Sequence, residues 1–147
     1  MSKEEIYHVT VDYSRSLAKM IRAGHYDWVN PDFTDITAKN FSIQGQGKLE
    51  INIELIHYCK SMEADEIIQD LDNRGLRPAT LPELLAFGAK YPKKQREFPI
   101  VALGSIWLWG GSRVVAYLSS FCSKRRLGLP SWDGGWNDEC RFAALRK

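Results

Sequence analysis

The stretch RPATLPELL, residues 77–85, decides the fold because it marks the start of a helix with several independent signals. Thr80 is typical of an N-cap, and Glu83 stands three residues later, so the pair predicts a capping box. Pro82 falls in the first turn, where its missing N–H costs nothing. The leucines of the stretch then recur at helical spacing. A helix is therefore predicted to start at residue 81, to pack through its leucines and to end at Tyr91.

On the N-terminal side of this helix, the pattern of apolar residues predicts two strands and two further helices. Residues 6–13 and 48–58 alternate between apolar and polar side chains, as half-buried strands do. Residues 14–24 and 62–74 carry apolar side chains at helical spacing, and a glycine closes each stretch. The first 60 residues are thus predicted to form a strand-helix-strand portion.

On the C-terminal side the pattern predicts a run of strands. Residues 99–109 are almost continuously apolar, as in a central strand, and residues 113–121 return after a Gly-Gly turn. Residues 123–138 read as a basic loop, and residues 140–147 as a last strand. Helices followed by a run of strands predict an α+β domain built on an antiparallel sheet.

Composition limits the class of protein. The chain has 147 residues, enough for one domain with its own core, and 44% of them are hydrophobic. No apolar run approaches the roughly 18 residues of a membrane span, and the charged N-terminus does not resemble a secretory signal. At least one of the three cysteines must be unpaired, and no Cys-x-x-Cys occurs. We therefore expect a cytoplasmic protein with reduced thiols and no membrane partner.

Charge and tryptophan are concentrated in the last third of the chain. Residues 91–147 hold ten Lys and Arg against four Asp and Glu, and they contain every tryptophan except Trp28. A basic, aromatic segment fits nucleic acid, and it equally fits a protein-binding surface, where Trp, Tyr and Arg are enriched.

The segment GLRPATLPELLAF, together with the end of the chain, resembles the C-type lectin-like fold. The branches in question are the formylglycine-generating enzymes and the variable proteins of diversity-generating retroelements, in which a G-x-R-L-P-T-x-x-E segment opens a helix packed on the sheet. Gly75, Arg77, Thr80 and Glu83 match that segment by spacing, and the closing strand from Arg141 to Arg146 matches in character. The resemblance covers residues 62–147. It implies a C-type lectin-like antiparallel sheet with flanking helices, to which residues 1–60 are an addition within one domain of residues 1–147.

The chain departs from this family at several points. Pro78-Ala79 replaces the usual Leu-Pro, and the Arg-Gly-Gly-Ser-Trp stretch of the formylglycine-generating branch is missing. Trp136-Asn137-Asp138 matches a triplet that binds calcium in sugar-binding lectins, but its partner triplet is absent and calcium needs six to eight oxygen ligands. We therefore predict neither a metal nor a cofactor.

Catalytic motifs are scarce, so we expect a binding module rather than an enzyme. No P-loop, GxSxG, GxGxxG or histidine metal motif occurs. His57 and Cys59 lie two residues apart at the end of a predicted strand, so their side chains share a face. The pair fits a nucleophilic dyad, and it also fits an ordinary core cysteine beside an edge histidine.

The favoured hypothesis is a non-catalytic ligand-binding module that recognises a protein partner through an aromatic loop surface near residues 109–138. Trp132 and Trp136 flank a Gly-rich turn that is expected to leave at least one ring partly exposed. In retroelement variable proteins, the resemblance implies, this region carries the ligand-binding face. The candidate residues are Trp109, Arg113, Tyr117, Ser119, Phe121, Trp132, Asp133, Trp136, Asn137 and Asp138.

Two alternatives remain open. A nucleic-acid-binding protein would use two short basic runs, formed by Lys93, Lys94, Arg96, Lys124, Arg125 and Arg126. An effector or inhibitor from a mobile element would bind a host protein by the same physics as the favoured hypothesis, with a different partner.

Overall fold

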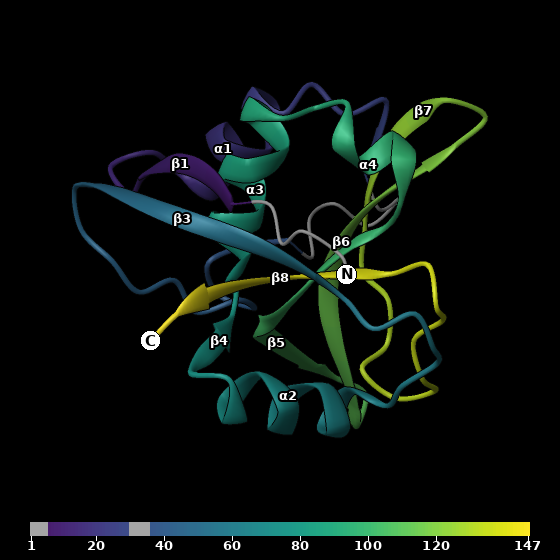
Figure 1. Ribbon diagram of the computed structural model, residues 1–147. Helices are drawn as coiled ribbons and strands as arrows, with labels where there is room; N and C mark the ends of the chain where they lie inside the picture. The colour runs from purple at the N-terminus through teal and green to yellow at the C-terminus, as the bar shows by residue number, and fades with distance from the viewer. Residues whose placement is uncertain (1–5, 30–35) are drawn as a thin grey trace.

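One large mixed sheet with helices on both faces makes up the protein (Figure 1). The structure, a computed structural model, describes residues 6–29 and 36–147. The strands are β1 Ile6–Asp12, β2 Trp28–Val29, β3 Lys48–His57, β4 Leu76–Pro78, β5 Ile100–Trp109, β6 Ser112–Phe121, β7 Lys124–Gly128 and β8 Arg141–Arg146. The helices are α1 Leu17–Ala23, α2 Ala64–Asn73, α3 Leu81–Lys90 and α4 Lys94–Glu97. The α+β class is confirmed, and no helix in the described ranges is long and apolar enough to cross a membrane.

The sheet is not purely antiparallel, which corrects the prediction. Its strand order is β1-β3-β8-β5-β6-β7-β2, with β4 also paired to β8. The last strand enters the middle of the sheet between β3 and β5, and it runs parallel to β5. The consecutive residues 142–145 are all buried, as expected of a strand covered on both faces. The short β2 is also parallel to its neighbour, β7.

One prediction about connectivity also needs correction. Residues 124–128, assigned to a basic loop, form β7 and pair with β6 around a two-residue turn at Cys122-Ser123. Both turn residues have positive φ (50° and 66°), a conformation usually supplied by Asn or Gly, so no hairpin signal was visible in the sequence. The N-terminal strands β1 and β3 belong to the same sheet as the C-terminal strands, and β3 pairs directly with β8.

The sheet separates two cores. In Figure 1, α1 and α3 lie above the sheet and α2 lies below it. The larger core packs α1 and α3 against residues such as Val9, Ile53 and Leu118. The second packs α2 against Ile56, Val101 and the tryptophans of the 132–136 turn.

The start of α3 is fixed by an ion pair between a buried carboxylate and a half-buried arginine, which the sequence showed only in part. Thr80 is the N-cap, and its backbone N–H donates to Glu83 Oε1 at 2.8 Å, as the capping box requires. The Thr80 hydroxyl faces the backbone N–H of Glu83, as in a capping box, but the two groups do not reach hydrogen-bond geometry. Arg77 adds a bidentate contact, with its two terminal nitrogens 2.9 Å and 2.8 Å from the Glu83 oxygens. Glu83 is only 3% exposed, so its charge depends on these partners.

The segment before α3 is also bonded to β5, and this contact distorts the strand. Gly104 N–H donates to Ala79 O at 2.8 Å, and Ser105 Oγ accepts from Leu81 N–H at 2.8 Å. A Cβ on Gly104 would lie 2.5 Å from that same Ala79 oxygen, so glycine is required there. The pairing of β5 with β6 shifts register between Ala102 and Trp107. The bulge therefore binds the start of α3, and the rest of β5 continues beyond it as a hairpin.

Replacing Arg77 by Met tests the ion pair with Glu83. Arg77→Met leaves the Glu83 carboxylate buried without its cation, and we expect the free energy of unfolding to fall by about 2–4 kcal/mol, since an orphaned buried charge is strongly destabilising. Urea unfolding measures this loss.

The matched control is Arg15→Met, which removes the Arg15–Asp12 pair (3.6 Å), in which the arginine is more than half exposed and the carboxylate keeps its hydrogen bonds from Ser14. Exposed pairs contribute about 0–1 kcal/mol, so this loss should be much smaller. Equal losses in the two variants would show that the Arg77–Glu83 pair does not anchor the helix.

Candidate functional site

The end of the β5–β6 hairpin carries three exposed apolar side chains. Leu108 is 72% exposed, Trp109 is 62% exposed and Ile106 is 41% exposed. These three residues are called the hairpin tip below. The turn that closes it is Gly110-Gly111, with φ of 55° and 82°, as predicted for a tight hairpin connection.

The prediction that Trp132 or Trp136 is partly exposed is wrong. Trp132 is 6% exposed and Trp136 is 7% exposed, and both belong to the core beneath α2. The Trp136 backbone exchanges two hydrogen bonds with Met62 (3.0 and 2.8 Å), and its ring meets Phe142 edge to face. The Gly-rich turn folds back under the sheet, so both rings serve stability.

Several other predicted residues have local structural partners. Arg113 donates to Asp133 Oδ1 at 3.0 Å, and its guanidinium lies 5.0 Å from the centre of the Trp132 ring, which it covers. Asn137 Oδ1 accepts from the Glu139 N–H at 3.0 Å and from the Cys140 thiol at 3.4 Å. Through these contacts Arg113, Asp133 and Asn137 stabilise the segment around residues 131–140.

The remaining predicted side chains lie on β6. Tyr117 and Ser119 are half-buried, whereas Phe121 is exposed at the far end of the strand. Because Trp109 and Phe121 stand next to the opposite ends of β6, they do not form one aromatic surface. The predicted surface is therefore divided into two separate sites.

The two basic runs come together, with one exception. Arg96 Nε donates to Ser123 O at 3.0 Å, and the Gln95 amide reaches two backbone oxygens of β6 and β7, so α4 lies against the β6–β7 hairpin (Figure 1). Arg126 stacks over Trp28 at 4.1 Å from the ring centre. We refer to this surface as the basic strip, which comprises Lys93, Lys94, Arg96, Lys124 and Arg126.

Arg125 is the exception and corrects the prediction. It is buried, and its guanidinium donates to the carbonyl oxygens of Gly24 and Gly88 and lies over the Tyr26 ring. Burial lowers the pKa of Arg125, so the surrounding carbonyls and ring are what hold its charge there. Arg125 thus joins α1, α3 and β7 and is not available to a ligand.

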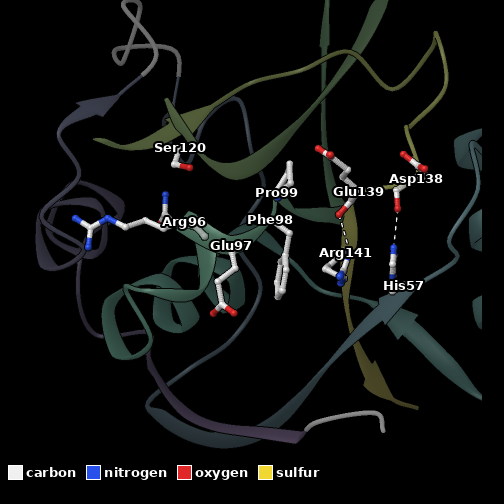
Figure 2. Close-up of a pocket in the computed structure, with 10 residues that line it drawn as sticks. His57, Arg96, Glu97, Phe98, Pro99, Ser120, Asp138, Glu139 and Arg141 are labelled. Atoms are coloured by element: carbon white, nitrogen blue, oxygen red, sulfur yellow. Dashed lines mark hydrogen bonds between the residues drawn. The ribbon is translucent and has the colours of Figure 1, made fainter. Parts of the chain in front are cut away.

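A cavity of about 520 Å³ lies beside the basic strip (Figure 2). It is lined by charged groups of both signs: Arg96 and Glu97 come from α4, and Asp138, Glu139 and Arg141 come from the start of β8 and the segment before it. Figure 2 shows these two groups on opposite sides, with the Phe98 ring between them. The guanidinium of Arg141 lies 4.2 Å from the centre of that ring. Some of these charges have partners within the protein, since Glu97 pairs with Lys94 at 3.4 Å and Arg141 donates to the Glu139 carbonyl oxygen at 2.7 Å.

His57 lines this cavity, and each of its ring nitrogens contacts another residue. Its Nε2 is 2.6 Å from the carbonyl oxygen of Asp138, and its Nδ1 is 3.4 Å from Cys59 Sγ (Figure 2 shows the first contact). Cys59 is exposed and has a left-handed backbone, with φ of 59°. The two side chains do meet, but not because they share a face of a strand as predicted: β3 ends at His57, and the left-handed backbone at Cys59 turns the chain back.

Comparisons with family models, with curated proteins and with solved structures give no match for this chain. Within residues 6–29 and 36–147, no three His, Cys, Asp or Glu side chains gather closely enough to hold a metal ion. The function must therefore be inferred from the geometry of these surfaces.

Sequence reasoning missed Leu108 and Ile106, because it assigned the whole apolar run to a buried central strand. The signal was present in the Gly-Gly pair that follows, since residues next to a hairpin turn lie at the ends of their strands, where packing from other elements is sparse. It also missed the Asp138 contact to His57, which joins residues 81 positions apart and has no local signature.

Truncating one buried and one exposed tryptophan tests whether Trp136 belongs to the core and Trp109 to the surface. Trp136→Ala should lower the free energy of unfolding by about 3–5 kcal/mol, as expected for a large ring removed from a core. Trp109→Ala loses only exposed area and a tilted contact with Trp107 at 6.3 Å, so its loss should stay below about 1 kcal/mol. Chemical unfolding of both variants checks the difference. A costly Trp109→Ala would mean that the hairpin tip is part of the core.

Proposed function

We propose that this protein is a non-catalytic binding module that docks on a protein partner through its hairpin tip. The observation that carries the proposal is that Ile106, Leu108 and Trp109 are all exposed at the end of one hairpin, with Leu108 and Trp109 on its opposite faces. Neighbouring exposed apolar side chains of this size mark interaction surfaces, whereas scattered single ones do not.

The hairpin tip suits a protein partner energetically. A Trp and a Leu supply large apolar area, and buried apolar area is worth roughly 25 cal/mol per Å². The tip is held by the Gly110-Gly111 turn and by cross-strand pairs such as Leu108 with Arg113, so little conformational entropy is lost on binding. Trp is also among the residues that dominate binding hot spots.

The C-type lectin-like scaffold belongs to this proposal. This scaffold is supported by the order of the elements that carry the resemblance. A capped α3 is followed by two long apolar strands and by a closing strand with Arg141 and Arg146. A mobile-element effector that inhibits a host protein would use the same surface, and the partner's identity separates the two.

Altering the hairpin tip should abolish capture of a protein partner. With the purified protein as bait in a nuclease-treated lysate, we expect the double variant Leu108→Asp with Trp109→Ala to lose proteins that the wild type retains. Hot-spot truncation costs about 2 kcal/mol or more, which is at least about thirtyfold in Kd. Quantitative mass spectrometry of the captured proteins makes the measurement.

Leu49→Asp on β3 is the control, because Leu49 is also exposed but lies two strands away from β5 in the sheet. It should retain the partner. Sedimentation velocity of the bait alone separates a foreign partner from a second copy of the chain. A captured set that is identical for the wild type and the double variant would refute the proposal.

A second candidate function, nucleic-acid binding, is favoured by one specific observation. Two basic runs that lie about 30 residues apart in the sequence meet on the basic strip, beside the half-buried Trp28 and the exposed Phe121. Proteins that bind single-stranded nucleic acid typically combine two features: cationic side chains that contact the phosphates, and aromatic rings nearby on which the bases stack.

The salt dependence of binding tests this second candidate. If about four cations of the strip contact phosphates, the logarithm of the affinity for a single-stranded oligonucleotide should fall with the logarithm of salt at a slope of roughly −3. Fluorescence anisotropy of a labelled oligonucleotide measures it, and Lys124→Glu with Arg126→Glu should remove the binding. The absence of binding at low salt, or a flat slope, eliminates the candidate.

A further inference from the structure

A groove of about 430 Å³ lies where β1, α1 and α3 meet, and we refer to it as the β1 groove. It is lined by residues 10–12 of β1, by Met20 of α1, and by the side of α3 that carries Leu85 and Ala86. The three elements lie next to one another in Figure 1. Because β1 is the terminal strand of the sheet, the strand wall of this groove is a sheet edge.

The backbone of β1 has one side that no strand in the described part of the chain covers. β1 pairs with β3 alone, and in an antiparallel ladder alternate residues direct both backbone groups away from the partner strand. His8 O accepts from Lys90 Nζ at 2.7 Å and from the Tyr91 hydroxyl at 3.0 Å, so His8 is directed away from β3. Tyr13 N–H, in contrast, donates to Gly47 O on the β3 side. The even-numbered residues of β1 therefore direct their N–H and C=O outward.

Thr10 is the outward-directed residue in the middle of this edge. Its N–H and C=O point the same way as His8 O, toward α3, and Thr10 lines the groove together with Lys90. Contacts close the edge at both ends, since His8 O is covered by α3 and Asp12 O accepts from Arg15 N–H. The four residue steps from His8 to Asp12 span roughly 13 Å, which is room for a short extended segment.

The groove also offers apolar contacts to such a segment. Val11, Met20 and Leu85 are buried at its base, and Ala86 beside them is half-buried. Side chains alternate between the two faces of a strand, so every second residue of a segment paired with β1 would face these groups. An alternating pattern of apolar residues is therefore what the groove fits.

The rim of the groove is positively charged. Arg15, Lys48 and Lys90 line it against a single carboxylate, Asp12, so positive charge is in excess. Asp12 is moreover engaged within the protein, because it accepts two hydrogen bonds from Ser14 and lies 3.6 Å from Arg15. A second copy of the chain on this edge would bring the same excess against itself, whereas an acidic segment is complementary to it.

We propose that the outer edge of β1 is a docking site for an acidic, extended peptide segment of a partner protein, which adds to the sheet as a further strand in the β1 groove. Main-chain hydrogen bonds with Thr10 supply affinity, and the apolar base and the cationic rim select the sequence, as in other cases of strand addition. The site lies three strands from β5, so it is independent of docking at the hairpin tip.

The test selects peptides without assuming their sequence. A displayed library of random eight-residue peptides is selected on the wild type and, in parallel, on Thr10→Pro. Because the Thr10 N–H points away from β3, proline removes a donor from the outer edge and leaves the ladder between β1 and β3 in place. Thr10→Ala keeps the N–H and is the matched control.

We expect the wild type and Thr10→Ala to enrich the same peptides, with Asp and Glu in excess and apolar residues at alternate positions. Thr10→Pro should bind these peptides at least about tenfold more weakly, since it leaves a partner group without its hydrogen bond. Lys48→Met should weaken them by roughly twofold to fivefold, as expected of a charge pair at an exposed rim. If no peptide depends on the Thr10 N–H, or if the dependent peptides are neutral or basic, the inference is wrong.

Amide hydrogen exchange of the wild type decides the question without a variant, should Thr10→Pro not fold. The Thr10 N–H should exchange quickly in the free protein and become protected when a selected peptide saturates it. The N–H groups of Val9 and Val11, which face β3, should be protected in both states. A Thr10 N–H that stays unprotected in the complex would place the peptide elsewhere and overturn the inference.

Sedimentation velocity distinguishes the proposed occupant from a second copy of the chain. We expect the wild type to sediment as the same species as Thr10→Pro. A wild-type dimer that Thr10→Pro dissociates would show that the edge pairs with another copy, and an acidic partner segment would then be the wrong occupant.

Discussion

The contact of Arg77 with Glu83 is the constraint on which the rest of the structure depends. A carboxylate buried at the start of a helix is costly unless its oxygens are satisfied, and here Arg77 and the Thr80 N–H satisfy them. The contact fixes the direction in which β4 leads into α3. Since β4 also pairs with β8 at the centre of the sheet, it joins the helical layer to the last strand.

This anchor has a consequence for β5. The strand bulges so that Gly104 and Ser105 bond the segment that opens α3, and its pairing with β6 resumes only at Trp107. The residues that follow extend past the two cores. Leu108 and Trp109 lie in this part of β5, beyond the bulge, and both are exposed at the hairpin tip.

Local signals predicted the elements well. The capping box placed the start of α3, period-two alternation placed β1 and β3, and the Gly-Gly pair placed the β5–β6 turn, because each depends on neighbours in the sequence. The position of β8 between β3 and β5, and the turn of non-glycine residues before β7, depend on distant packing, which local patterns do not carry.

The candidate sites were predictable only in part, for the same reason. Trp109 and most of the basic strip were identified from composition, but whether a tryptophan is a core residue or a contact residue is decided by what covers it. Trp132 and Trp136 are covered by α2 and its neighbours, and Arg125 is turned inward by carbonyls of α3 and the end of α1. The contact of Cys59 with His57 depends on a left-handed residue after the end of β3, and the carbonyl of Asp138 that His57 contacts is 81 positions away, so neither has a local signature.

The most direct measurement of the central claim is site-specific photocrosslinking in lysate, with a benzophenone side chain placed at position 108. Position 6 is the reference, because Ile6 is similarly exposed at 64% but lies on β1, three strands from β5. We expect a discrete protein adduct from position 108 and none of the same mass from position 6. Adducts that are absent or identical at the two positions would contradict a docking surface at the hairpin tip.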